Sequence, residues 1–81
     1  MAVLLLFAAA REAAGTGRED VDGATVGEVL AAARVRYGSV FSDVLAASRV
    51  WCNGEPTTDD EAVSASDEVA VLPPVSGGHV G

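Results

Sequence analysis

The last apolar run of the chain ends in two consecutive prolines, and this limits where ordered structure can lie. Residues 68–72 read as a strand, and Pro73-Pro74 follow it directly. Proline fixes φ and has no backbone N–H to donate to a sheet ladder, so the strand must stop there. Beyond it, Gly77-Gly78 form a thin backbone that can enter a slot too narrow for side chains. The sequence therefore predicts a folded domain over residues 1–72 and a flexible C-terminal tail over residues 73–81.

The composition indicates one small globular domain. The chain has 81 residues, of which 49% are hydrophobic. A domain of this size has a modest core with little room for an enclosed active-site cleft, so we expect a binding or carrier protein without independent catalysis. The net charge is −7, from twelve acidic residues, five Arg and no Lys. This charge argues against nucleic acid and anionic membranes. It suits either a basic protein partner or simple solubility.

The chain has one Cys and one His, far apart in the sequence. An internal disulfide is therefore excluded, as is a structural zinc site without ligands from a partner, and we expect neither a metal nor a permanently bound cofactor. The apolar run Ala2–Ala10 lacks a basic n-region and is too short to cross a bilayer, so we expect a cytoplasmic protein. Cys52 is expected to be a small buried hydrophobe rather than a persulfide-bearing thiol.

Most of the remaining signals are short strands. Val3–Ala8 is continuously apolar, as in a central strand covered on both faces. Residues 19–22 are polar and weakly alternating, as at a sheet edge. Residues 49–52 predict another strand, ended by the Asn53-Gly54 turn signal. Single helical turns are expected at residues 11–14 and 41–45, and a polar loop at residues 57–66.

One helix is clearly indicated. Thr25 and Glu28 match the two positions of a capping box, and Gly38 is a helix stop. Between them the apolar residues repeat with helical spacing, at Val26, Val29, Leu30, Ala33 and Tyr37. One main helix among several strands predicts an α+β fold with a mixed sheet.

Three segments resemble the small subunit of molybdopterin synthase, a sulfur carrier of the ubiquitin-like β-grasp family. They are Leu6–Ala8 with Arg11–Gly15, then Thr25–Glu28, then Asp67–Ala70 continued by Pro73–Gly78. Asn53-Gly54-Glu55 is a weaker fourth match. The resemblance implies the β-grasp arrangement, in which one helix packs across a mixed sheet whose first and last strands are central.

The resemblance also implies a function. In this family an adenylyltransferase related to ubiquitin-activating enzymes uses ATP to make an acyl-adenylate on the terminal glycine. A persulfide sulfur then displaces AMP, and cleavage of the sulfur–sulfur bond by a thiol, which forms a disulfide, leaves a thiocarboxylate. The large synthase subunit receives the tail, and the sulfur passes to a pterin precursor in molybdenum cofactor biosynthesis. By resemblance, Gly78 bears the thiocarboxylate and Gly77 lets the tail pass. Extended, residues 73–78 reach roughly 20 Å.

The chain departs from the family pattern at its end, because His79-Val80-Gly81 follow the second glycine. We expect a C-terminal protease to remove these residues. The alternatives are a carrier that cannot be charged, a carrier charged on Gly81, or residues foreign to the native chain. His79 is expected to be an inert tail residue.

A partner-binding patch is expected beside the tail. Strand alternation predicts that Phe7, Trp51 and Leu72 face away from the helix. Scattered exposed apolar side chains are ordinary, but an outward aromatic beside a functional tail favours a patch. The resemblance adds Pro56 at the edge of this patch. Arg11 either pairs with an acidic residue of the partner or is a solvated turn residue.

Other functions stay open. A sulfur carrier for thiamin or another metabolite would use the same thiocarboxylate, although such chains tend to be shorter and to lack the Pro-Pro-Val segment. A ubiquitin-like protein modifier would end in isopeptide bonds, and the absence of Lys excludes only chains linked through its own lysines. A plain interaction module would fit an unprocessed tail.

Overall fold

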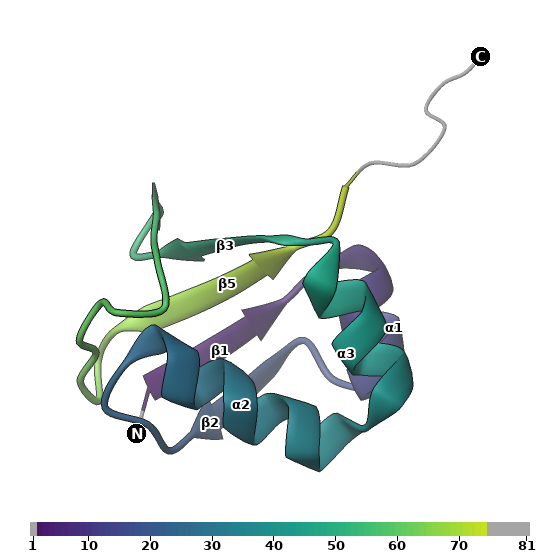
Figure 1. Cartoon of the computed structure of the whole chain (residues 1–81), viewed down its shortest axis with the longest axis horizontal. Coiled ribbons are helices and arrows are strands. Elements are labelled where there is room, and N and C mark those ends of the chain that lie inside the picture. Colours follow the sequence, from purple (N-terminus) through teal and green to yellow (C-terminus); the bar gives the residue numbers. More distant parts are fainter. Residues whose placement is uncertain (1, 75–81) are drawn as a thin grey trace.

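The computed structural model describes residues 2–74 of the chain (Figure 1). Within that range the elements follow one another as β1 (Ala2–Leu6), α1 (Ala8–Ala14), β2 (Arg18–Val21), α2 (Val26–Tyr37), α3 (Ser39–Ala46), β3 (Arg49–Cys52), β4 (Glu55–Pro56) and β5 (Glu68–Leu72). The predicted α+β class is confirmed. No helix in the described part is long and apolar enough to cross a membrane.

The five strands form one mixed sheet in the order β2-β1-β5-β3-β4. β1 and β5 lie in the middle and run parallel, with Leu4 opposite Val69. Each of the other neighbouring pairs is antiparallel. The first and last strands are therefore central, as expected, and β2 is at an edge of the sheet.

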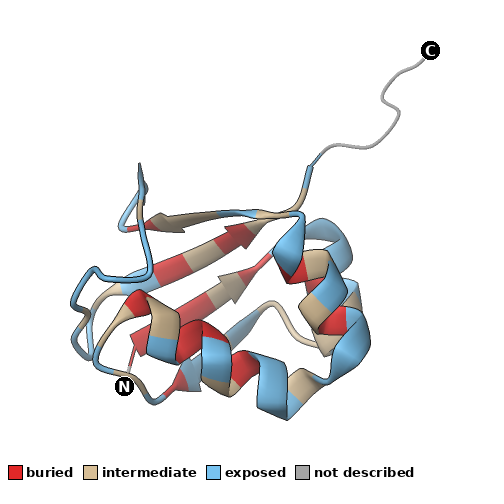
Figure 2. Cartoon of the chain, in the orientation of Figure 1, coloured by how far each residue is buried: buried red, intermediate tan, exposed pale blue. Residues whose placement is uncertain are grey.

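The core lies between one face of the sheet and the helices (Figure 2). Alternate residues of the two central strands are buried there, namely Leu4, Leu6, Val69 and Val71. They meet Val26, Val29, Leu30 and Ala33 of α2, together with Phe41 and Leu45 of α3. The buried residues of α2 are those that its helical spacing predicted, and Tyr37 is partly buried against the core.

The prediction that the central strands are covered on both faces is wrong. Leu5 of β1 lies opposite Ala70 of β5, and both are only half-buried. Strand alternation turns them away from Leu4 and Val69, which face the helices. We call the side of the sheet that carries Leu5 and Ala70 the open face. Leu5 and Ala70 have no covering layer in the described chain, although Val3, which alternation places on the same face, is buried.

Two short helices replace the single turns that the sequence predicted, so α2 is the longest of the three helices within residues 2–74. β1 ends at Leu6 rather than at Ala8, because Phe7 is already the N-cap of α1. Ala8 adopts a φ of 50°, which is uncommon for a residue other than glycine. Gly15 ends α1 at a φ of 80°, and its N–H donates to the carbonyl oxygen of Arg11 over 2.9 Å. This stop was predicted.

The start of α2 is held by side-chain and backbone caps. The N–H of Glu28 donates to Thr25 Oγ1 at 3.2 Å, which confirms Thr25 as the N-cap. Glu28 Oε1 accepts from the N–H of Ala24 at 2.8 Å, one residue before the usual capping-box partner. The N–H groups of Val26 and Gly27 donate to carbonyl oxygens of the loop at residues 59–61. The otherwise unpaired donors of the first turn are thereby satisfied.

Candidate partner-binding site at the open face and the tail exit

Five residues, one from each strand, form a row across the open face. Leu5 lies opposite both Arg18 and Ala70, and Trp51 lies opposite both Ala70 and Pro56. Directly paired residues project from the same side of a sheet, so all five side chains share the open face. Leu5, Ala70 and Trp51 are half-buried, whereas Arg18 and Pro56 are exposed. The row therefore has an apolar centre, with small Ala70 between two larger side chains.

A groove of about 380 Å³ lies at the end of this face where the chain leaves the sheet. Its lining residues are Ala47, Arg49, Trp51, Leu72, Pro73 and Pro74. Arg49 lies directly opposite Leu72, so the two share the open face with Trp51, which is two residues along β3. We call this feature the tail-exit groove. It is apolar except for one cation, Arg49, at its rim.

The structure brings together some of the predicted patch residues. Trp51 and Leu72 both line the tail-exit groove, and Pro56 lies opposite Trp51 in the neighbouring strand. The sequence predicted Phe7 within a strand, but Phe7 is instead the N-cap of α1. It does not line the groove. It is 45% exposed and follows Leu6, which pairs with Val71, at the same end of the sheet as Leu72.

Arg11 is exposed on α1, away from the groove. Its Nε lies 3.3 Å from the position that a Cβ on Gly17 would occupy, so its side chain passes over this glycine. Gly17 in turn accepts a hydrogen bond from the N–H of Leu6 at 3.0 Å. Arg11 is therefore supported by the turn before β2 rather than by a strand of the open face.

The sequence interpretation missed Leu5, Ala70, Ala47 and Arg49. Leu5 stands in a uniformly apolar run, which carries no alternation from which its outward direction could be inferred. Arg49 did carry a signal, since it stands two residues before Trp51 and must share its face within one strand. Ala47 reaches the groove only because α3 ends at Ala46, next to the start of β3.

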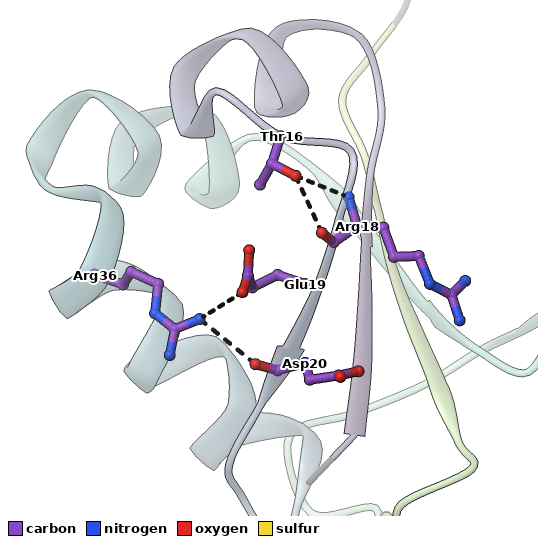
Figure 3. Close-up of polar contacts among 5 residues, drawn as sticks. All are labelled: Thr16, Arg18, Glu19, Asp20 and Arg36. Carbon is purple, nitrogen blue, oxygen red and sulfur yellow. Dashed lines mark hydrogen bonds and ion pairs between the residues drawn. The ribbon is translucent and has the colours of Figure 1, made fainter.

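The charges of the open face are divided along the strands. Arg18 and Arg49 lie on the half nearer the tail, whereas Asp20 and Glu68 lie two residues further from it on β2 and β5. Figure 3 shows Arg18 projecting to the opposite side of β2 from Glu19. Glu19 pairs with Arg36 of α2 at 3.4 Å on the helix side. The two cations thus extend from the open face.

Cys52 does not contribute a reactive group. Its side chain is buried in the core, as expected. Burial raises the pKa of the thiol, and the charges of Glu61 and Asp67 raise it further. The thiol is therefore protonated at neutral pH and is a poor nucleophile. Within residues 2–74, no three His, Cys, Asp or Glu side chains are grouped so as to hold a metal ion.

The predicted tail residues, Gly77, Gly78 and His79-Val80-Gly81, lie outside the described residues. The structure describes the chain up to Pro74, the point from which the tail continues. β5 ends at Leu72, as the double proline predicted, and Pro73 and Pro74 line the tail-exit groove.

Comparison with known proteins identifies the family. The ThiS family model matches residues 4–78. Small archaeal modifier protein 1 of Haloferax volcanii is 43% identical, over 90% of this chain and 95% of the relative. A crystal structure of that protein superposes with a TM-score of 0.78 at 41% identity, covering 94% of this chain and 97% of the other.

Two other solved structures are similar. The solution structure of small archaeal modifier protein 1 from Methanosarcina acetivorans gives a TM-score of 0.83 at 28% identity, with 95% of each chain covered. A Pyrococcus furiosus protein assigned as molybdopterin converting factor, subunit 1, gives 0.79 at 26% identity, covering 91% of this chain and 97% of the other. The chain therefore belongs to the ThiS family of ubiquitin-like sulfur carriers, and its fold is the β-grasp.

Proposed function

We propose that this protein carries sulfur as a thiocarboxylate on Gly78, after a protease has removed His79-Val80-Gly81. The observation that carries the proposal is the extent of the family match, which ends at Gly78 and leaves the last three residues outside it. A carboxylate is a poor acyl electrophile, so the terminal glycine must first be activated. The activating adenylyltransferase would use ATP, and the carrier itself would need no bound cofactor.

The open face and the tail together suit a carrier that works inside other proteins. Half-buried apolar side chains on an uncovered sheet face are typical of a surface that a partner covers. The groove residues Trp51 and Leu72 would contact a partner while the tail from Pro73 enters its active site. Phe7, Pro56 and Arg11 would lie at the margin of this contact.

We propose a pterin precursor as the sulfur acceptor, with the large subunit of molybdopterin synthase as the partner. This rests on the resemblance of the Pro73–Gly78 segment and on the likeness to the Pyrococcus furiosus protein assigned as molybdopterin converting factor, subunit 1. We propose the cytoplasm as its location, where ATP and a persulfide donor would both be available. A thiocarboxylate used in thiamin or another pathway would differ only in the acceptor.

A second candidate function is protein modification. It is favoured by the likeness to proteins named small archaeal modifier protein 1, one of which is 43% identical. In that function the activated glycine would be attacked by an amine of a target protein rather than by sulfur. The 81 residues contain no Lys, so this segment offers no side-chain amine for its own chain extension.

The mass of the intact protein, purified from its native cells, tests the proposed function. A sulfur carrier gives a species that ends at Gly78, together with one in which a carboxyl oxygen is replaced by sulfur. A modifier gives larger species in which the same terminus is joined to other proteins. Reconstitution with the large synthase subunit and the pterin precursor then tests the acceptor, because dithiolene formation must require the thiocarboxylate form.

A further inference from the structure

The tail-side half of the open face carries a positive charge that contrasts with the whole chain. The net charge is −7, yet Arg18 and Arg49 are the charged strand residues nearest the tail on this face. Asp20 and Glu68 are confined to the far half. Within the described residues, the one ion pair joins Arg36 to Glu19, so Arg49 has no acidic partner there.

We propose that the tail-exit groove binds a partner segment that presents a carboxylate beside an apolar side chain. This segment would belong to the enzyme that activates the C-terminus, so the inference rests on the proposed function. The apolar side chain would lie between Trp51 and Leu72, and the carboxylate would pair with Arg49.

Three features of the groove define its occupant, and one of them, the cation Arg49, favours an acidic and apolar segment over a purely apolar one. Five of its six lining residues are apolar, so burying an apolar side chain there is favourable. No acidic residue lines it, so the guanidinium of Arg49 is available for a carboxylate, which it can bind with two parallel hydrogen bonds. Pro73 and Pro74 also line the groove and carry no N–H, so they cannot donate hydrogen bonds to a partner strand.

The division of charge would also set the orientation of the partner. A partner bound in the opposite orientation along the strands would place its carboxylate near Glu68 instead of Arg49, and the like charges would repel. The correct orientation directs the active site of the partner toward the tail. Arg49 would therefore contribute to specificity as well as to affinity.

The test compares Arg49→Glu with Arg34→Glu. Both variants change the net charge by the same two units, but Arg34 is exposed on α2, on the other side of the sheet. Dissociation constants of the full chain for the activating enzyme are measured by calorimetry at low and high salt. We expect Arg49→Glu to weaken binding about tenfold or more, with a smaller loss at high salt, and Arg34→Glu to change it by less than about twofold.

Arg49→Gln, which keeps the size of the side chain, is expected to show an intermediate loss and a weaker dependence on salt than the wild-type chain. Circular dichroism melting checks that each variant is folded. Equal losses of affinity for Arg49→Glu and Arg34→Glu would overturn the proposal, since the change in net charge alone would then explain the effect. Wild-type affinity in folded Arg49→Glu would also overturn it. A wild-type chain that binds the activating enzyme neither at full length nor as the form ending at Gly78 would instead contradict the proposed function, and this inference with it.

Discussion

Asn53 donates from Nδ2 to Oδ1 of Asp67 over 3.0 Å and so ties the turn between β3 and β4 to the start of β5. Asn53 Oδ1 accepts from the N–H of Glu68 at 2.9 Å, and Asp67 Oδ2 accepts from the N–H of Ser64 at 2.8 Å. Both side chains are therefore satisfied by neighbours from separate segments. This cluster lies at the end of the sheet opposite the tail.

The hydrogen bond from Asn53, and then those from Ser64, lower the pKa of Asp67. The carboxylate therefore stabilises the fold above the unfolded-state pKa, near pH 4, and this contribution is lost as the pH falls through the lower folded-state pKa. Asp67→Asn should lower the free energy of unfolding at neutral pH. The difference in the free energy of unfolding between Asp67→Asn and wild type, the gap, should narrow below about pH 4. Urea denaturation across this range measures the gap.

Asp22→Asn is the control for that prediction, because Asp22 is exposed and accepts no side-chain hydrogen bond within the described residues. Its free energy of unfolding at neutral pH should differ little from that of wild type. A gap for Asp67→Asn that stays constant from about pH 7 to pH 3 would contradict the role assigned to the ionised carboxylate.

Thr25→Ala should reduce the free energy of unfolding by about 1 kcal/mol, because the N–H of Glu28 loses its acceptor at the start of α2. Thr25→Ser keeps the hydroxyl and should retain most of the stability. Carrier activity of the folded fraction should be unchanged in both. Denaturant midpoints of Thr25→Ala that equal those of wild type would show that this cap does not stabilise the helix.

Gly23→Ala should destabilise the protein by about 1–3 kcal/mol through overpacking. A Cβ at Gly23 would lie 2.7 Å from the backbone nitrogen of Val29 and 2.8 Å from its Cγ2, closer than atoms can approach. The loop before α2 can pass over the helix only without this atom. The neighbouring exposed change Asp22→Ala is the control, and thermal unfolding is the measurement. An unchanged melting temperature for Gly23→Ala would refute the close approach.

Leu72→Asp and Phe7→Asp should each weaken binding of the large synthase subunit by about 2 kcal/mol or more, because both introduce a charge into an apolar contact. Leu72 lines the tail-exit groove and Phe7 is exposed at the same end of the sheet. Val35→Asp is a matched control, since Val35 is 88% exposed on α2. Titration calorimetry gives the affinities. Wild-type affinity in both folded variants would remove these residues from the interface.

Features governed by local chemistry could be predicted from the sequence. The Asn53-Gly54 turn has φ values of 52° and 84°, as a two-residue hairpin requires, and Thr25 caps α2. These depend only on residues close in the chain. The arrangement of the strands could be predicted only from the resemblance to a family, because the sequence pattern alone does not determine which strands pair.

Features that depend on sheet register could not be predicted. A run of apolar residues from Ala2 to Leu6 gives no sign that Leu5 turns to the open face. The position of Arg49 opposite Leu72 follows from the pairing of β3 with β5, which joins segments separated by a long loop. The candidate groove is therefore a product of tertiary structure, although Trp51 and Leu72 in it were anticipated individually.

The central claim is that the reactive carboxylate belongs to Gly78. It is tested most directly by ATP–pyrophosphate exchange with the activating enzyme, comparing the full chain with a form that ends at Gly78, followed by mass measurement for the gain of sulfur. The form ending at Gly78 should be adenylated and gain sulfur, whereas the full chain should not, because its free carboxylate lies three residues further along. A further form lacking Gly78 should be as stable and should not be charged. A full chain that is charged as well as the shorter form, without being cleaved, would contradict the claim and assign the reactive carboxylate to Gly81.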